Sequence, residues 1–268
     1  MQTISTQIFD IGYMDTLAGG DTALHRLDAR AKLLVTALFI VCVVSFNHYE
    51  ISRLMPFFLY PVFLIAAGEL PAGYLLRKVL AVAPFAVFVG MFNPLLDRGT
   101  LFQLGPLAVS GGAASFFSIL LRFLLTVTTA LALVALTGVN GICAALESCG
   151  VPKVFVMQLL FLNRYITVLA GEAGRMARAR ALRSFSAGEM PAAVFARLAG
   201  QLLLRAYARA ERIYSAMLCR GFYGRIQLQR SSTVGGKEIA FVATWAAVFT
   251  LFRLVDIPQF FGNFLTGL

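Results

Sequence analysis

Long apolar stretches that lack charged residues constrain this chain more than any other feature. A helix needs about 20 mostly apolar residues to cross a hydrocarbon layer about 30 Å thick. The chain is 59% hydrophobic and only 13% charged, against about 25% charged residues in an average soluble domain. We therefore expect an all-α, polytopic membrane helical bundle. The expected spans are Leu33–Tyr49, Leu54–Gly68, Val79–Leu96, Gly112–Thr137 and Ile239–Phe252.

Basic residues are in excess at alternate ends of these spans. The segment before the first span and the loop expected between spans two and three are basic, whereas the intervening loops pair one Arg with one acid. The positive-inside rule then places the N-terminus in the cytoplasm and, after five spans, the C-terminus outside. The residues that set this orientation are Arg26, Arg30, Lys32, Arg77 and Lys78.

The net charge of +10 is concentrated in one region. Residues 150–237 hold 14 of the 23 Lys and Arg residues but only three acids, so the rest of the chain is nearly neutral. A basic region can bind nucleic acid, anionic lipid or an acidic protein. Its only lysines are Lys153 and Lys237, and its arginines alternate with apolar stripes. That pattern favours contact with protein or membrane lipid over nucleic acid.

The run Val154–Gly171 is apolar enough to be a further span. If it crossed, all the following arginines would lie outside, and Arg164 would lie in its middle. We interpret it as a helix that starts in or against the membrane and emerges into the cytoplasm. This gives five spans, with six as the alternative. The expected regions are residues 1–137 (N-terminal segment and four spans), 138–237 (cytoplasmic helices) and 238–268 (last span).

Two long helices are expected within the basic region, one from Pro152 to about Ser184 and one from about Ala192 to Cys219. Proline suits a first helical turn, and glycine commonly follows a helix end. A turn is expected at Gly188 and Pro191, and a stop at Gly221 and Gly224.

The second of these helices is amphipathic. An apolar stripe and a separate basic face both follow helical spacing, which predicts an amphipathic helix with a basic face. The stripe comprises Phe195, Leu198, Leu202, Ala206, Ile213 and Met217. The basic face comprises Arg205, Arg209 and Arg212.

The ends of the two helices have similar sequences. Leu182-Arg183-Ser184-Phe185 and Cys219-Arg220-Gly221-Phe222 both place Arg before a small residue and Phe, 37 positions apart. A cation at a helix C-terminus is also expected from the helix dipole alone. Two matching ends suggest more, because an Arg on a rigid tip docks well into an acidic cleft. Two tips suit a partner that is present in two copies.

These residues resemble the transmembrane components of energy-coupling factor (ECF) transporters, of the CbiQ type used for cobalt. Cys219–Phe222, followed by Gly224-Arg225, matches the signature that ends a coupling helix in that family. Leu182–Phe185 matches it with Ser for Gly, and Arg180 within Arg178-Ala179-Arg180 is an alternative counterpart. His25–Leu33 is similar to the family's Leu-Asp-Pro-Arg-x-Lys stretch, with Ala29 in place of Pro. Further similar segments are Leu146–Pro152, Arg164-Tyr165 and Val168-Leu169.

The resemblance implies a scaffold in the plasma (inner) membrane with long cytoplasmic coupling helices. Two ABC-type ATPases would bind these helices, and a separate small membrane subunit would bind the substrate. Cobalt is the expected cargo, with nickel or a vitamin left open. The residues implied in ATPase binding are Arg183, Ser184, Arg220, Gly221 and Phe222.

We expect no catalysis and no cofactor in this chain itself. The nearest approach to a phosphate-binding GxxxxGK[ST] loop is Gly235–Glu238, which lacks the upstream Gly and the Ser/Thr. With only His25 and His48, and four cysteines without a CxxC pair, a metal site of its own is not expected. Any ATP hydrolysis would belong to the partner ATPases.

Arg122 is the one charged residue in the middle of an expected span. It could contact the substrate-binding subunit or pair within the bundle. A charge at this depth is also what a secondary transporter or permease with its own substrate site would use, which is the alternative function.

Overall fold

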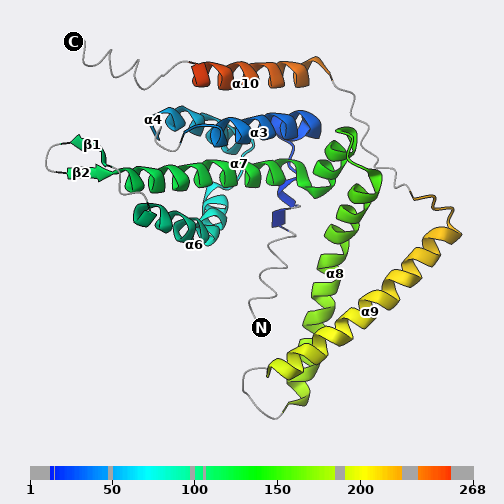
Figure 1. Ribbon diagram of the computed structural model, residues 1–268. Helices are drawn as coiled ribbons and strands as arrows, with labels where there is room; N and C mark the ends of the chain where they lie inside the picture. The colour runs from blue at the N-terminus through cyan, green and yellow to red at the C-terminus, as the bar shows by residue number, and fades with distance from the viewer. Residues whose placement is uncertain are drawn as a thin grey trace. The chain divides into compact units, whose positions relative to one another are not determined.

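The computed structural model describes residues 13–14, 16–47, 51–96, 100–104, 107–184, 191–224 and 235–254. The chain divides into two compact units. One, here called the bundle, comprises Leu17–Gly138 and Ser232–Leu268. The other, here called the helix pair, comprises Met1–Thr16 and Val139–Ser231. Both are helical (Figure 1), so the predicted all-α fold class is confirmed.

Every expected span contains helix. The bundle elements are α2 (Ala23–Arg26), α3 (Ala29–Val44), α4 (Ile51–Leu54), η1 (Met55–Phe58), α5 (Leu59–Ala67), α6 (Ala72–Leu96), most of α7 (Gly111–Ser148) and α10 (Gly236–Leu254). One boundary prediction was wrong. α6 begins just after Pro71 rather than at Val79, because no proline lies between them and Gly73 alone does not stop the helix, so Arg77 and Lys78 lie in the helix and not in a loop.

The connection between α6 and α7 holds a short hairpin that was expected to be a loop. Strands β1 (Thr100–Leu104) and β2 (Leu107–Ser110) pair antiparallel, with Leu104 opposite Leu107 and Thr100 opposite Ser110.

Contacts at both ends of α3 fix the directions of its neighbours. At its start, Lys32 Nζ donates to the carbonyl of Leu136 at 3.2 Å, and at its end Arg122 Nη2 donates to the carbonyl of Phe46 at 2.9 Å. α7 therefore runs antiparallel to α3. Arg253, at the end of α10, donates from Nη2 to Ser45 Oγ at 3.1 Å. α10 therefore runs parallel to α3, as Figure 1 shows them lying side by side.

The short helical stretch Ser52–Ala67 runs back along α3. Near its start, the rings of Phe57 and Phe46 have centroids 5.3 Å apart. Just after its end, Gly68 lies so close to Leu136 that a Cβ there would be 2.5 Å from Leu136 Cδ2. It thus reaches from one end of α3 to the other, although it is shorter than a typical span.

α6 completes the alternation. It starts after the turn at Gly68, and near its other end Gly90 packs against Phe116 in the first turns of α7. Among the described residues of the bundle, five helical stretches therefore alternate in direction, with α3, α6 and α10 in one direction and Ser52–Ala67 and α7 in the other.

Aromatic side chains form the core of the bundle. Phe39 is fully buried and has its ring centroid 4.9 Å from that of Tyr60 and 5.5 Å from that of Phe249. Trp245 lies edge-on to Tyr60 at 4.7 Å. The Tyr60 hydroxyl shares a 3.1 Å hydrogen bond with Thr36, so its polar end is satisfied inside the core. Three sequence-distant segments meet in this cluster.

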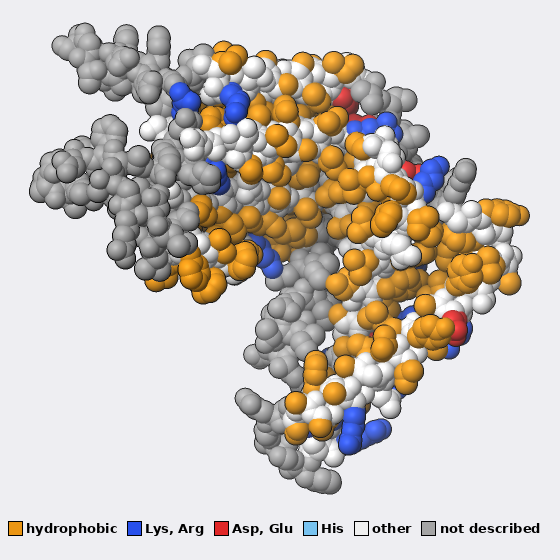
Figure 2. Space-filling model, viewed as in Figure 1, with side chains coloured by type: hydrophobic (Ala, Val, Ile, Leu, Met, Phe, Trp, Pro, Cys, Tyr) orange, Lys and Arg blue, Asp and Glu red, His pale blue; other side chains and the backbone are white. Residues whose placement is uncertain are grey.

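The outer face of α6 is apolar and exposed (Figure 2). Such a surface suits lipid rather than water, because lipid tails are as apolar as these side chains and contact between them costs no free energy. Among the described residues, three helical stretches are long and apolar enough to cross a membrane, namely Ala72–Phe92, Ser115–Ser148 and Lys153–Arg183. The large side chains exposed on α6 are Leu76, Leu80, Val82, Phe85, Val87, Phe88, Val89, Met91 and Phe92.

The helix pair consists of the end of α7, α8 (Lys153–Arg183) and α9 (Ala192–Cys219). Both predicted helices are confirmed, and Gly171 and Gly174 do not interrupt α8. Gly138, with φ of 68° and ψ of 161°, interrupts the helical geometry of α7 where the two units divide. A larger residue would be strained there, because φ is in the range that only glycine adopts freely.

Candidate docking site at the ends of two helices

α8 ends in an extended residue. Arg183 is its last helical residue and is exposed, and Ser184 follows with φ of −94° and ψ of 125°. The Ser184 amide donates to the carbonyl of Arg180 at 3.0 Å, and its hydroxyl donates to the carbonyl of Ala181 at 3.2 Å. Ser184 thus satisfies two carbonyls that the helix end would leave unpaired. Arg180, the alternative docking residue, is half-buried, and Phe185 lies outside the described residues.

α9 ends in a Schellman motif. The Phe222 amide donates to the carbonyl of Met217 and the Gly221 amide to that of Leu218, both at 3.0 Å. Gly221 has φ of 77°, the left-handed conformation that this motif requires. The motif places exposed Arg220 at the cap position of the helix end. Gly221 is therefore needed for the shape of the tip, whatever else it contacts.

The two ends are alike in sequence but not in backbone. Both present an exposed Arg, yet Gly221 turns the chain into the left-handed region whereas Ser184 continues it extended. The difference follows from side chains, because serine strongly disfavours positive φ and glycine does not. The two tips therefore offer an Arg in two different local settings.

Each tip also carries a very exposed apolar side chain. Leu182, next to Arg183, is 89% exposed, and Tyr223, three residues after Arg220, is 91% exposed. Among the large hydrophobic side chains of the described residues, these are the two most exposed. Arg and Tyr are among the residue types that contribute most to the stability of a protein interface when they are covered.

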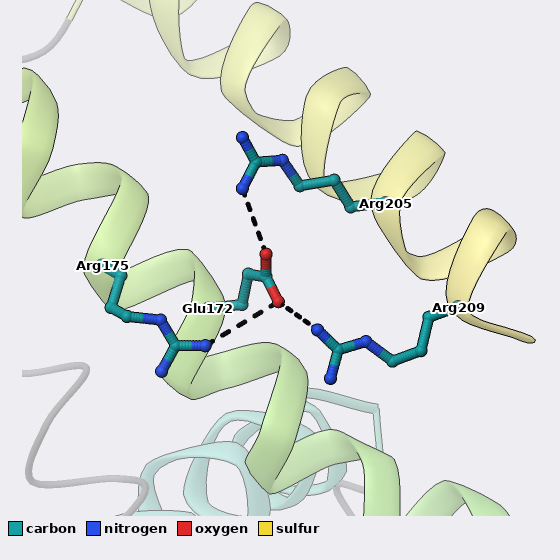
Figure 3. A network of polar contacts seen from close by, with 4 residues as sticks. All are labelled: Glu172, Arg175, Arg205 and Arg209. Atoms are coloured by element: carbon teal, nitrogen blue, oxygen red, sulfur yellow. Dashed lines mark hydrogen bonds and ion pairs between the residues drawn. The ribbon is translucent and has the colours of Figure 1, made fainter. Parts of the chain in front are cut away.

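One carboxylate links α8 to α9 (Figure 3). Glu172 Oε1 accepts a hydrogen bond from Arg205 Nη1 at 3.2 Å, and Oε2 accepts one from Arg209 Nη2 at 2.6 Å. Arg175, on α8 itself, has its Nη2 3.8 Å from Oε2. The hydrogen bond from Arg205, with the charges of Arg209 and Arg175, holds the pKa of the Glu172 carboxyl below its usual range, although partial burial acts in the other direction.

This contact involves two of the three arginines on the expected basic face of α9. Arg205 and Arg209 pair with Glu172 of α8 while staying partly exposed, and Arg212 is exposed. The expected apolar stripe is confirmed at Leu198, Leu202, Ala206, Ile213 and Met217, which are among the less exposed positions of α9. Phe195 was wrongly assigned to it, because its side chain is exposed.

A mostly apolar pocket of about 480 Å³ lies between the same two helices. Arg209 is on its border, and the rings of Phe161 and Tyr165 lie one turn apart in its α8 wall, with centroids 6.1 Å apart. The helices therefore do not fill the space between them over this part of their contact. The other residues that line the pocket are Gln158, Leu169, Leu203, Ala206, Tyr207, Ala210, Ile213, Tyr214 and Met217.

The stretch His25–Leu33 has a structural role in the bundle. Asp28 caps α3 by accepting a hydrogen bond from the Arg30 amide at 3.0 Å. Lys32 is buried, and its amine donates to Leu136 beside the Gly138 break in α7. His25 is held between Thr22 Oγ1 at 2.6 Å and the Leu17 carbonyl at 3.0 Å, and burial lowers its pKa. This stretch ties the start of α3 to the end of the bundle part of α7.

Arg122 contacts other residues of the bundle. Its Nη2 atom donates to the carbonyls of Phe46 at 2.9 Å and Asn47 at 2.7 Å, just beyond the end of α3. A cation suits this position because the last carbonyls of a helix lack intrahelical partners. Arg253 lies over the Phe46 ring at the same end, with its guanidinium carbon 4.9 Å from the centroid.

Comparison with known proteins places these features in a family. The family model CbiQ, described as cobalt transport protein, matches residues 20–231. The matched range includes the His25–Leu33 stretch, both helix ends and the Glu172 contact. The chain belongs to the CbiQ family.

Several curated relatives of this CbiQ protein have the name energy-coupling factor transporter transmembrane protein EcfT. The EcfT of Heliobacterium modesticaldum is 28% identical over 252 residues, which cover 87% of this chain and 93% of the relative. That of Thermosediminibacter oceani is 25% identical, covering 84% and 91%. That of Bacillus subtilis is 27% identical, covering 76% and 82%. The expected resemblance to ECF transmembrane components is thereby confirmed.

Sequence reasoning missed Glu172 as a linking residue of this CbiQ protein. It is one of only three acids in residues 150–237, and Arg209 follows it by the same 37 positions that separate Arg183 from Arg220. That spacing was visible, but spacing does not reveal which face of a helix meets its neighbour. Among the described residues, no three His, Cys, Asp or Glu side chains gather to hold a metal ion.

Proposed function

We propose that this chain is the transmembrane coupling component of an ECF-type importer. In this role it links two cytoplasmic ABC-type ATPases to a separate small membrane subunit that binds the substrate. Membership of the CbiQ family and the printed names of the EcfT relatives support the proposal. ATP hydrolysis is assigned to the partner ATPases, and this chain transmits their movement.

The observation that carries the proposal is the pair of exposed tips. Arg183 and Arg220 lie at the C-terminal ends of two long helices, each with an exposed apolar side chain close by in sequence. Exposed Leu182 and Tyr223 have no role in the core of the chain itself. A partner that presents an acidic cleft with an apolar wall would cover both kinds of group at each tip.

The helix directions support five spans with the helix pair on the cytoplasmic side. α3 and α10 run parallel, so the chain leaves the bundle at Gly138 and returns at Gly236 on the same side, where α3 begins. If α8 alone crossed the membrane, α10 would have to run the other way. Arg26, Arg30 and Lys32 precede or begin α3, which supports a cytoplasmic N-terminus and an outer C-terminus.

We propose cobalt as the cargo. The family description names cobalt transport, and this chain's contribution is to couple rather than to recognise the ion. Arg122 gives no support to a substrate site within this chain, since its described hydrogen bonds go to carbonyls of the bundle. Uptake of radioactive cobalt, challenged with an excess of nickel or of a vitamin, separates the three cargoes.

The test of docking is the double substitution Arg183→Ala with Arg220→Ala. We expect the protein to reach the membrane in normal amount, while co-purification of the ATPases and ATP-dependent uptake are lost. Arg197→Ala, at an exposed position in the first half of α9, is the matched control and should change neither. Arg180→Ala tests the alternative first tip. Normal ATPase binding by the double variant would rule out docking through these tips.

A further inference from the structure

Among the described residues, a single acid makes the ion pairs between α8 and α9. Glu172 is only 12% exposed and receives hydrogen bonds from two arginines of the opposite helix, while Arg175 approaches from its own helix (Figure 3). The three guanidinium groups approach the carboxylate from both helices, so its orientation is restricted. Charged hydrogen bonds of this kind are directional as well as strong.

The link lies at the same distance from both tips. Arg183 follows Glu172 by eleven positions on α8, and Arg220 follows Arg209 by eleven positions at the end of α9. At 1.5 Å per residue each arm is about 16 Å long. Any change in the angle between the helices at this contact therefore moves both tips, and moves them by similar amounts.

Apolar packing contributes little to holding this angle. α9 has no buried residue among those described, and Val156 is the only one on α8. The pocket between the helices leaves part of their facing surfaces out of contact. A close-packed interface would fix the crossing angle through many contacts, as protein interiors do. Of the two hydrogen bonds that Glu172 accepts from α9, the one from Arg209 is the shorter, at 2.6 Å.

We propose that Glu172 is a positioning residue which, through Arg205 and Arg209, sets the separation between the docking tips at Arg183 and Arg220. The inference rests on the proposed docking function and adds a contact within the chain that fixes the distance between the two docking tips. Glu172 itself does not touch the ATPases. Its loss leaves both tips intact but no longer at a fixed separation, so the two ATPases are no longer engaged together.

The direct test is a distance measured between the tips by spin labelling of the full-length protein in lipid nanodiscs without ATPases. Exposed Cys219 is a native labelling site beside Arg220, and Leu182→Cys supplies one beside Arg183. Cys42, Cys143 and Cys149 are replaced by serine or alanine. The variants are Glu172→Gln and Arg209→Gln. Glu211→Gln, at an exposed carboxylate of α9, is the matched control.

We expect one narrow distance in the parent and the control, and a broad or shifted distribution in Glu172→Gln and Arg209→Gln. Without the labels, the same two variants should lower ATPase co-purification by about fivefold, a size typical of coupling between contacting charges. The combination of Glu172→Arg with Arg209→Glu keeps the charges but exchanges their helices. It should restore both the narrow distance and ATPase binding, which a merely destabilised helix pair would not do.

An unchanged distance in Glu172→Gln and Arg209→Gln would overturn the inference, as would failure of the exchanged pair to restore either readout. The distance needs no ATPase, so it stands apart from the docking proposal. If Arg183→Ala with Arg220→Ala binds ATPases normally while the Glu172 variants still broaden the distance, docking is wrong and the positioning contact is right.

Discussion

In the bundle, the rings of Phe39, Phe57 and Phe249 are almost completely buried, whereas α9 of the helix pair has no buried residue and α8 has one. The bundle brings three sequence-distant segments around one aromatic cluster. The helix pair brings two helices together across a partly open pocket and one carboxylate. The polar contacts also differ, since Lys32 of the bundle is buried while Arg175 and Arg205 of the helix pair are largely exposed.

This difference suggests two tasks. Close packing makes the bundle a stable platform that lipid can surround. Few buried contacts make the helix pair easier to displace, as expected for an element that moves during function. The stability and position of the helix pair should then depend on charge and on partners, whereas those of the bundle should depend on packing.

The largest effect is expected in the aromatic core. Phe39→Ala removes a ring that contacts Phe57, Tyr60 and Phe249, and should destabilise the protein by about 3 kcal/mol through lost packing and the cavity left behind. Unfolding in mixed micelles measures it. Phe88→Ala on the lipid-facing side of α6 is the control and should have a much smaller effect. Equal effects from both would mean that the bundle is not organised around this cluster.

A smaller loss is expected at Lys32. Lys32→Met keeps the length of the side chain but leaves the Leu136 carbonyl without the donated hydrogen bond, at a cost of about 1–3 kcal/mol. The control Lys153→Met removes an exposed amine whose ion pair with Glu147 is 3.9 Å long, and such pairs contribute little. The same unfolding assay compares them. If the two substitutions changed the free energy of unfolding equally, the hydrogen bond between Lys32 and Leu136 would not stabilise the bundle.

Substitutions in the helix pair should change ATPase binding more than they change the overall stability of the protein. Gly221→Ala forces alanine into a left-handed conformation at a cost of about 1–2 kcal/mol, so the α9 tip should rearrange and bind the ATPases more weakly. Gly200→Ala, in the middle of the same helix with open space around it, should instead stabilise α9 by about 0.5–1 kcal/mol. ATPase co-purification and helix content distinguish the two. Tighter binding by Gly221→Ala would argue against the tip geometry described here.

Much of the fold was predictable because local chemistry determines it. The ends of α9 were placed correctly from Pro191 on one side and Gly221 on the other, and α8 from Pro152. The alternation of apolar runs and basic segments likewise predicted the order of the bundle helices. The candidate tips followed from a repeated short pattern, which the CbiQ family match then placed in context.

The remaining features depend on tertiary contacts that periodicity does not encode. Arg205 and Arg209 follow a helical stripe, but only the packing of α8 on α9 shows that this stripe meets Glu172. Arg77 and Lys78 were expected in a loop before the third span, but both lie inside α6, where long basic side chains can extend past an apolar surface. The two tips looked equivalent until the φ angles separated Gly221 from Ser184.

Two native cysteines of the helix pair provide the most direct test of the central claim, that the tip at the end of α9 engages an ATPase. Both are exposed, with Cys219 beside Arg220 and Cys149 at the end of α7. Their rates of reaction with a membrane-impermeant maleimide are compared in the chain alone and after assembly with the ATPases. We predict that assembly slows labelling of Cys219 severalfold and leaves Cys149 unchanged. Equal labelling of Cys219 in both states would contradict docking at this tip.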